Sequence, residues 1–374
     1  MRILIAPDKF KGSLTAMEAA SAITEGVLRV YPDAVTTQLP IADGGEGTLE
    51  AAVAAGYEER INAVVGPILA PLGAAWALHK EATGPVTAVI ETAQASGLAH
   101  MVPTPENALR AHSYGCGQLI AAALDAGATE IVLGLGGSAM TDGGSGALRA
   151  LGLKPLDAAG NIVPLGGGSL GDVVDVDISG LDPRLGGVKF RIAVDVRNPL
   201  YGLEGAAHVF GPQKGADGDA AERLDVGLRN WASVLRQATG REVNIPGAGA
   251  AGGFPASFLA FSNATLEGGF ALVAGLTGLA EQLQEADLVI TGEGSMDSQS
   301  LTGKAPIALA DAARARAIPV IVVAGRIMVS PEELARHGVV AAAQLLDVAP
   351  SPEDAIADAA KYLTWATSQV LEGA

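Results

Sequence analysis

The chain has very little cysteine and few aromatic residues. Its 374 residues include a single cysteine, Cys116, so an internal disulfide is excluded and a reducing compartment is expected. Phe, Trp and Tyr together make up only 4% of the chain, which argues against the aromatic platforms on which nucleic-acid bases stack. The five histidines show no spacing typical of a metal site.

Positive charge is also scarce. The chain has 24 Lys and Arg residues against 41 Asp and Glu, which gives a formal net charge of −17. Such an acidic surface repels nucleic acids and anionic membranes, so neither is expected as a partner. No apolar run is long enough to span a bilayer, and the N-terminus reaches Pro7-Asp8-Lys9 too early for a signal peptide. We therefore expect a soluble cytoplasmic protein.

Apolar residues and glycine are plentiful. Hydrophobic residues make up 49% of the chain, enough for a large core, and the length suggests two domains. Many of the 49 glycines lie in short clusters after apolar runs, as expected where the backbone must approach a ligand.

Strand and helix patterns alternate at both ends of the chain. Thr15 and Glu18 form a capping-box pattern at the start of a helix. The predicted strands cover residues 2–6, 35–40, 288–291, 319–324 and 339–345, and the predicted helices cover residues 15–30, 48–55, 305–315, 331–337 and 351–371. This order predicts an α/β fold in which residues 1–67 and 285–374 form one discontinuous domain with a Rossmann-like or flavodoxin-like parallel sheet.

The middle of the chain, residues 68–284, is predicted to be an inserted α/β domain with a mixed sheet. Its predicted elements are strands over residues 74–79 and 86–91 joined by a turn at Thr83-Gly84-Pro85, a helix from Thr104-Pro105 to about Ala126, strands over 131–135 and 190–194, and a helix over 217–237. A cleft between the two domains is the default place for a ligand.

A glycine-rich loop with two carboxylates, Glu293 and Asp297, follows the apolar strand at residues 288–291. It closes on Gly303-Lys304, and Pro306 then marks the start of a helix. A helix N-terminus and a lysine attract anions, and carboxylates can hold a divalent metal. This pattern indicates a phosphorylated ligand handled through a metal ion, although an ordinary solvated turn has the same composition.

Further polar loops follow other predicted strands. Asp8, Lys9, Lys11 and Ser13 precede a helix and could cradle a phosphate or form an ordinary βα loop. A cluster of acids and glycines, Asp43, Gly44, Gly45 and Glu46, could bind a substrate hydroxyl or cap the next helix.

Two candidate groups lie in the middle of the chain. Asp195 could accept a proton from an alcohol and Arg197 could hold a carboxylate or phosphate, while Asn198-Pro199 could equally make this segment a simple turn. Lys214 stands among glycines, where a lysine packs against little, and is interpreted as functional.

Two familiar patterns are discounted. Residues 134–139 fit the dinucleotide motif G-x-G-x-x-A, which also needs a second strand that ends in an acid. The nearest candidate, Asp157, follows Pro155, which spoils that strand. Residues 167–171 fit G-x-S-x-G without the strand and helix of a nucleophile elbow. The first pattern keeps open an NAD-dependent hydroxy-acid dehydrogenase, and a non-catalytic sensor of small acids is a further alternative.

The polar loops together resemble those of the type I glycerate kinase family. The matching segments are residues 6–13, 42–48, 134–144, 195–200, 210–216, 291–294 and 303–306, so the resemblance covers nearly the whole chain. Cys116 and Met140-Thr141 depart from the family pattern. The family implies ATP-dependent phosphorylation of D-glycerate to 2-phosphoglycerate, or 3-phosphoglycerate in some relatives, and two α/β domains around a cleft.

Phosphoryl transfer depends on positioning and charge neutralisation, which suggests a role for each loop. In this hypothesis Asp195 is the base and Lys9 and Lys304 stabilise the transferred group. Glycerate would be bound by Asp43, Gly44, Gly45, Glu46, Arg197 and Asn198, the ATP phosphates by Asp8, Lys11, Ser13, Lys214, Gly292 and Gly294, and Mg²⁺ by Glu293 and Asp297. Asp297 and Asp195 could exchange roles, and a homodimer is one expected state, because sequence alone decides neither point.

Overall fold

The computed structural model describes residues 1–81 and 84–373 and contains two compact units. Unit 1 comprises Met1–Asp43, Glu50–Gly56 and Phe270–Ala374, and unit 2 comprises Gly44–Leu49 and Tyr57–Gly269. The chain passes between them four times: after Asp43, inside α2 (Thr48–Ala54), after Gly56, and after Gly269, the first residue of α11 (Gly269–Thr277). Within the described ranges, no helix is both long and apolar enough to cross a membrane.

Unit 1 is built on a five-stranded sheet in the order β15-β13-β11-β1-β2, and every strand pair is parallel. The strands are β1 (Arg2–Ile5), β2 (Val35–Gln38), β11 (Leu288–Thr291), β13 (Val320–Ala324) and β15 (Val339–Gln344). Counted along the chain, this is the 2-1-3-4-5 order of doubly wound, flavodoxin-like sheets. The predicted parallel sheet is therefore confirmed, although its first and third strands are separated by almost the whole of unit 2.

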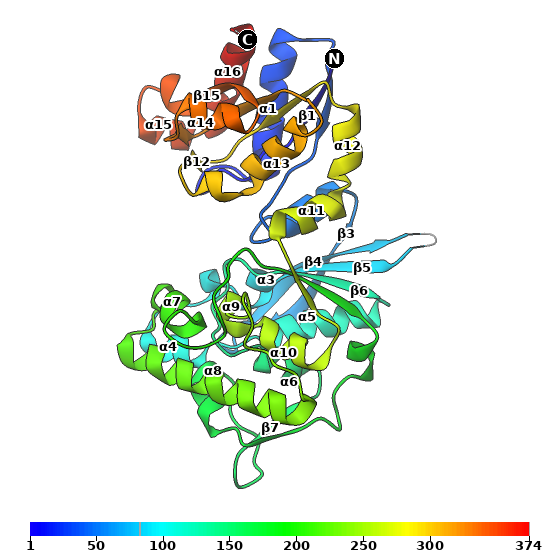
Figure 1. Cartoon of the computed structure of the whole chain (residues 1–374), viewed down its shortest axis with the longest axis vertical. Helices are drawn as coiled ribbons and strands as arrows, with labels where there is room; N and C mark the ends of the chain where they lie inside the picture. The colour runs from blue at the N-terminus through cyan, green and yellow to red at the C-terminus, as the bar shows by residue number, and fades with distance from the viewer. Residues whose placement is uncertain (82–83, 374) are drawn as a thin grey trace. The chain divides into compact units, whose positions relative to one another are not determined.

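Successive side chains of these strands point to opposite faces of the sheet. Both faces are apolar, so helices cover both. The α-helices that lie wholly in unit 1 are α1 (Ala16–Val30), α12 (Leu279–Glu285), α13 (Ala305–Arg314), α14 (Pro331–Arg336), α15 (Pro352–Ala357) and α16 (Ala359–Glu372). Ile3 and Ile5 belong to the core beneath α1 and α16, which pack side by side (Figure 1), whereas Leu4 belongs to the core beneath α13. Full burial of each such side chain contributes about 1.5–3 kcal/mol.

Local sequence explains how α1 starts and how closely it packs. Thr15 and Glu18 form the predicted capping box, with each side chain accepting from the other residue's backbone N–H. A Cβ at Gly26 would lie 2.6 Å from the carbonyl oxygen of Thr364 and 2.7 Å from Cβ of Thr367, so only glycine allows α16 to approach this closely.

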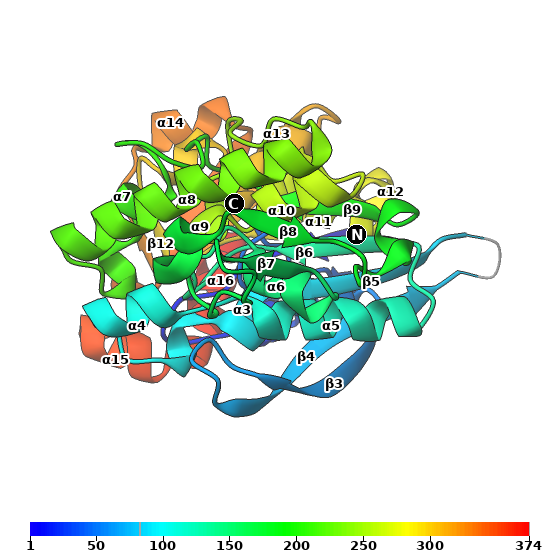
Figure 2. The ribbon, with the colours of Figure 1, turned by 90° about the horizontal axis from the view of Figure 1, so that it is seen from below.

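Unit 2 contains a six-stranded mixed sheet in the order β10-β9-β6-β5-β4-β3. The strands are β3 (Glu58–Val65), β4 (Pro71–Lys80), β5 (Val86–Glu91), β6 (Glu130–Gly134), β9 (Lys189–Ala193) and β10 (Thr265–Glu267). β5, β6, β9 and β10 are parallel, and β3 and β4 extend the sheet as an antiparallel pair. The predicted mixed sheet is thus confirmed, and α5 packs against β3, β4 and β5 (Figure 2).

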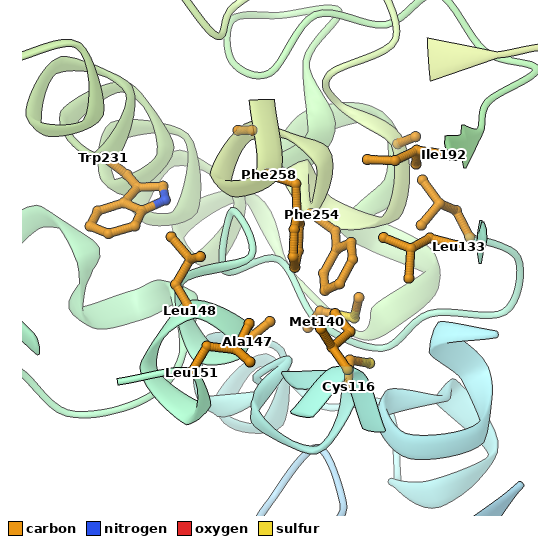
Figure 3. Packing of buried hydrophobic residues seen from close by; sticks show 14 of the residues in the cluster. Cys116, Leu133, Met140, Ala147, Leu148, Leu151, Ile192, Trp231, Phe254 and Phe258 are labelled. Atoms are coloured by element: carbon orange, nitrogen blue, oxygen red, sulfur yellow. The ribbon is translucent and has the colours of Figure 1, made fainter. Parts of the chain in front are cut away.

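One large core fills unit 2 (Figure 3). Its helices are α3 (Thr92–Ser96), α4 (Pro105–Arg110), α5 (Tyr114–Asp125), α6 (Ser145–Ala150), α7 (Ala206–Phe210), α8 (Gly218–Thr239), α9 (Ala250–Gly253) and α10 (Pro255–Phe261). Cys116 and Met140, the positions that depart from the family pattern, are both fully buried there. Trp231 is also buried, and its indole N–H bonds Gly143 O at 3.2 Å.

Two predicted helices are each divided into two. The helix expected from Thr104-Pro105 to Ala126 ends at Arg110 and restarts at Tyr114, because the buried Asp142 carboxylate accepts hydrogen bonds from the amide and hydroxyl of Ser113, both at 2.8 Å. The helix expected over 351–371 breaks at Asp358, whose φ of −115° and ψ of 38° are not helical.

The sequence did not predict β3. This edge strand has only one buried side chain, Val64, and half of its residues are exposed, so its hydrophobic alternation is weak. The next two strands in the chain, β4 and β5, form the expected antiparallel pair, in which Lys80 lies opposite Val86. The turn predicted at Thr83-Gly84-Pro85 falls partly on residues 82–83, which lie outside the described residues.

Candidate active site

The loops after β1 and β11 meet at the carboxyl edge of the sheet in unit 1. These strands are neighbours at the point where the winding of the sheet reverses, which is where doubly wound sheets bind ligands. The amide of Asp8 donates to Gly292 O at 2.9 Å, and the Thr291 hydroxyl donates to Ala6 O at 2.7 Å. The structure therefore brings together two loops that lie almost 300 residues apart in sequence.

Two glycines allow close packing of the loop after β11. A Cβ at Gly292 would lie 1.7 Å from Val323 O, and a Cβ at Gly294 would lie 3.1 Å from the amide nitrogen of Lys11. The two glycines predicted to bind phosphate thus have a packing reason of their own. Gly292 lets the loop after β11 approach β13, and Gly294 lets it lie against the loop that carries Lys9 and Lys11.

Three carboxylates influence one another at this edge. Burial is the main cause that raises the pKa of Asp8 to about 7; the negative charges of Asp43 and Glu293 raise it further, while the hydrogen bond from the Lys9 amide opposes the rise. Burial also raises the pKa of Glu293, and the positive charge of Lys304 acts in the opposite direction. The predicted cationic and acidic residues of unit 1 therefore share one electrostatic environment.

The carboxylate of Glu293 has the character of a cation ligand. Glu293 is 7% exposed, and its Oε1 has no hydrogen-bond partner among the groups that the structure describes. A buried carboxylate oxygen of this kind costs free energy unless a partner satisfies it, so it fits a bound cation. In the described ranges, no group of three or more His, Cys, Asp or Glu residues has the arrangement of a metal site.

Asp297 has a clear local function. Its Oδ1 accepts hydrogen bonds from the amides of Gln299, at 2.8 Å, and Ser300, at 3.1 Å. These bonds lower the pKa of Asp297, and the bond from the Ser300 amide has the largest effect. They also fix the turn before Lys304, which is the N-cap residue of α13. Its predicted role as a metal ligand stays a prediction.

Ser13 is likewise part of a turn. Its hydroxyl donates to Phe10 O at 3.0 Å, and the amide of Phe10 donates to Leu14 O at 2.9 Å. The turn needs Gly12, whose φ is +84°. The hydroxyl therefore stabilises the loop that carries Lys11, and a phosphate contact by Ser13 stays a prediction.

The carboxyl ends of three parallel strands define the corresponding edge of unit 2. Glu91 ends β5, the glycine-rich loop from Gly134 follows β6, and Asp195 follows β9. Across this edge lies the segment Gly44–Gly47. The predicted glycerate-binding glycines and the predicted base are thus brought to one edge of one sheet.

Asp195 and Gly44 meet at Gly269. Asp195 is exposed, and its Oδ1 accepts the Gly269 amide at 2.8 Å. A Cβ at Gly44 would lie 2.5 Å from Cβ of Ala193 and 2.6 Å from Cα of Gly269. Only glycine permits this approach, and it places the segment beside the carboxylate predicted to accept the proton.

Asn198 has a structural role that the sequence left open. Its side-chain amide donates to Glu204 O at 2.8 Å, and its carbonyl accepts from the amides of Gly247 and Gly249 at 3.2 and 3.0 Å. These bonds fix the turn after Asp195. The side chain of neighbouring Arg197 is exposed, and its contact with glycerate stays a prediction.

The reason given for a functional Lys214 is wrong. A lysine among glycines was expected to pack against little, but Lys214 is 1% exposed and among the largest fully buried side chains. Its Nζ donates to Met140 O at 2.6 Å and to Ser138 Oγ at 3.4 Å. Burial lowers the pKa of this lysine to about 7, with the charge of Asp142 acting in the opposite direction.

Sequence reasoning missed Glu91. It ends an apolar strand, is 4% exposed, and its Oε1 accepts the amides of Gly47 and Leu49, both at 2.8 Å. A glutamate directly after a fully apolar run is unusual, because buried carboxylates need partners, and that signal was available in the sequence.

The two discounted motifs lack the structure that their functions need. After β6 the chain does not enter a helix until Ser145, so residues 134–139 are not the start of a dinucleotide-binding helix. Residues 167–171 lie in a 3₁₀ helix, Gly167–Asp172, and not between a strand and an α-helix.

Each unit of this α/β protein carries a glycine-rich, charged loop edge at the carboxyl ends of its parallel strands, an arrangement typical of an enzyme. A model of the glycerate kinase family matches residues 3–373. The chain is 46% identical to a glycerate 2-kinase of Escherichia coli K12, covering 91% of this chain and 89% of the relative. It is 45% identical to a glycerate kinase of Bacillus subtilis 168, covering 97% and 95%.

A solved structure agrees with these relatives. The crystal structure of a Salmonella typhimurium LT2 protein assigned as glycerate kinase 2 matches with a TM-score of 0.87 and 41% identity, covering 100% of this chain and 98% of that one. The chain belongs to the glycerate kinase family. The predicted enzyme class, a kinase with an alcohol as acceptor, is confirmed, and this favours the kinase over the dehydrogenase and the sensor.

Proposed function

We propose that the protein transfers the terminal phosphoryl group of ATP to the 2-hydroxyl of D-glycerate and releases 2-phosphoglycerate. The observation that carries this proposal is the 46% identity, over 91% of the chain, to a protein named glycerate 2-kinase. The edges of the two sheets support it, because each presents charged groups beside closely packed glycine backbone.

The loops of unit 1 suit the nucleotide phosphates. Lys9 and Lys11 follow β1, and Lys304 precedes the N-terminus of α13, so cations and backbone amides lie at the carboxyl edge of the sheet, where doubly wound folds bind anions. In this proposal the lysines neutralise the charge that develops on the transferred group. The overall charge of −17 makes such local cations necessary for an anionic substrate.

The carboxylates of unit 1 suit a divalent cation. Glu293, whose buried Oε1 has no hydrogen-bond partner among the described residues, is the first candidate ligand, and Asp297 is the second. Bound Mg²⁺ would neutralise phosphate charge during transfer. The protein's own contribution is to hold Glu293 in place through the bond from the Gly325 amide to Glu293 O, at 3.1 Å.

The edge of unit 2 suits glycerate. Asp195 is exposed and fixed by the Gly269 amide, so it can take the proton of the attacking hydroxyl, while Arg197 can pair with the carboxylate of the substrate. The Gly44–Gly47 segment, with Asp43 before it, would orient a hydroxyl. The proposed role of Lys214 is to hold residues 138–140 in place rather than to touch phosphate, since its Nζ is already bonded within unit 2.

The test is turnover of the Asp195→Asn variant with ATP, Mg²⁺ and D-glycerate. We expect kcat to fall by about 10²–10⁴-fold with the Kd for ATP unchanged, because the amide cannot accept the proton. Asp219→Asn, at an exposed aspartate of α8, is the matched control and should retain activity. Near-normal turnover of Asp195→Asn would show that Asp195 is not the base. Phosphorus NMR of the product made by the wild-type enzyme would distinguish 2-phosphoglycerate from 3-phosphoglycerate.

A further inference from the structure

Glu91 is a buried carboxylate to which the sequence assigned no role. It lies at the carboxyl end of β5 and is 4% exposed. Its Oε1 accepts two backbone amides, from Gly47 and Leu49, each at 2.8 Å. Hydrogen bonds to an ionised acceptor are roughly twice as strong as neutral ones, so this carboxylate fixes the position of both amides.

The segment held by Glu91 is also confined by the loop after β6. A Cβ at Gly136 would lie 2.7 Å from the amide nitrogen of Glu46, and a Cβ at Gly137 would lie 2.4 Å from the Glu46 carboxylate. The amide of Leu135 donates to Gly44 O at 3.2 Å. The loop after β6 therefore packs directly against the backbone of residues 44–46.

The end of β9 and the start of α11 supply the third support. Gly44 packs against Ala193 and Gly269, and Gly269 in turn donates its amide to Asp195. The segment thus contacts the carboxyl ends of three consecutive parallel strands, with Glu91 as its charged anchor. Any movement of the segment at Glu91 changes the distance between its backbone and Asp195.

We propose that Glu91 is a positioning residue that fixes the Gly44–Gly47 segment for recognition of glycerate. This inference rests on the proposed function, because it takes the segment as part of the glycerate site. In this proposal Glu91 acts through the amides of Gly47 and Leu49, which donate to its carboxylate. Small misplacements of groups that orient a substrate can cost about 10²-fold in rate, so the anchor has a kinetic consequence.

Two variants at this position separate charge from the presence of an acceptor. Glu91→Gln keeps an acceptor oxygen of the same reach but removes the charge, whereas Glu91→Ala removes both hydrogen bonds. We expect kcat/KM for glycerate to fall about 10-fold in Glu91→Gln and about 100-fold or more in Glu91→Ala, with the KM for ATP within twofold of wild type.

Glu130 provides a matched control in the same sheet. It is the first residue of β6, at the amino end of the strand, where its neighbour in β5 is Thr87. Its Oε1 lies 3.2 Å from Nη1 of Arg191. Glu130→Gln therefore removes a half-buried carboxylate without touching the segment, and its kinetic constants should stay within twofold of wild type.

Hydrogen exchange of the Gly47 and Leu49 amides supplies a readout that does not depend on turnover. Exchange at both amides should accelerate in Glu91→Gln while the thermal midpoint stays close to that of Glu130→Gln. The proposal is overturned if Glu91→Gln matches Glu130→Gln in the KM and kcat for glycerate. It is also overturned if the KM values for glycerate and ATP rise together as the thermal midpoint falls, which indicates general destabilisation. A wild-type enzyme without activity on glycerate would instead refute the proposed function.

Discussion

Replacing Asp8 with asparagine should change how the stability of the protein depends on pH. Asp8 follows β1 beside Asp43 and Glu293, and its pKa rises from 3.8 to about 7, mainly because burial disfavours the charged form. Asparagine has the same shape, and its side-chain oxygen can still accept the Lys9 amide, which bonds Asp8 Oδ1 at 2.7 Å. The substitution therefore removes a titration while preserving the contact.

The sign of the effect follows from proton binding. Between pH 3.8 and about 7 the folded protein retains the Asp8 proton and the unfolded chain releases it, so raising the pH through this window lowers the stability of the wild type. Each pKa unit corresponds to about 1.4 kcal/mol, which gives an upper bound of about 4 kcal/mol. Because Asp8 is partly exposed to solvent, which screens its charge, we expect about 2 kcal/mol.

The assay is urea unfolding of wild type and Asp8→Asn at pH 4, 5, 7 and 8 in metal-free buffer. Relative to the wild type, the free energy of unfolding of the variant should rise by about 2 kcal/mol from pH 4 to pH 8. Glu333→Gln is a control of opposite sign, because the hydrogen bond from the Ser330 amide lowers the pKa of Glu333. This variant should be less stable than the wild type at neutral pH, and the difference should disappear as the pH falls. A difference between Asp8→Asn and wild type that is equal at pH 4 and pH 8 would refute the reasoning.

Two further predictions concern the loop after β6 and the lysine that holds it. Gly136→Ala places a methyl group 2.7 Å from the Glu46 amide nitrogen, so we expect a loss of about 1–3 kcal/mol in stability and at least a 10-fold loss of kcat/KM for glycerate. Gly171→Ala, with nothing within 4 Å, is the control, and equal behaviour of the two variants by urea unfolding and kinetics would contradict the packing argument. Lys214→Met removes the donor to Met140 O. It also removes a lysine whose pKa is about 7 in the folded protein, against an ordinary value of 10.5. Since unfolding takes up a proton between those values, the stability advantage of the wild type over the variant should grow by about 3 kcal/mol from pH 7 to pH 9.5, and a constant difference across that range would disprove the role of burial.

Sequence periodicity was sufficient for the elements with strong local signals. The capping box at Thr15 and the apolar runs of β11 and β13 were predicted because their patterns depend only on neighbouring residues. A long-range hydrogen bond accounts for one of the errors. The break before Tyr114 is caused by Asp142, which lies 29 residues from Ser113 in sequence. No local pattern near Ser113 indicates that partner.

The sequence by itself determined the family, the α/β class and the two groups of charged, glycine-rich loops, because these depend on which residues follow each strand. The tertiary structure decided which loops are neighbours. It placed the Asp8 loop beside Gly292 and the Gly44–Gly47 segment beside Asp195, and it showed that Lys214 is buried and that Glu91 anchors the segment. These relationships arise from strand order and from packing between distant segments, and such contacts leave no periodic signal in the chain.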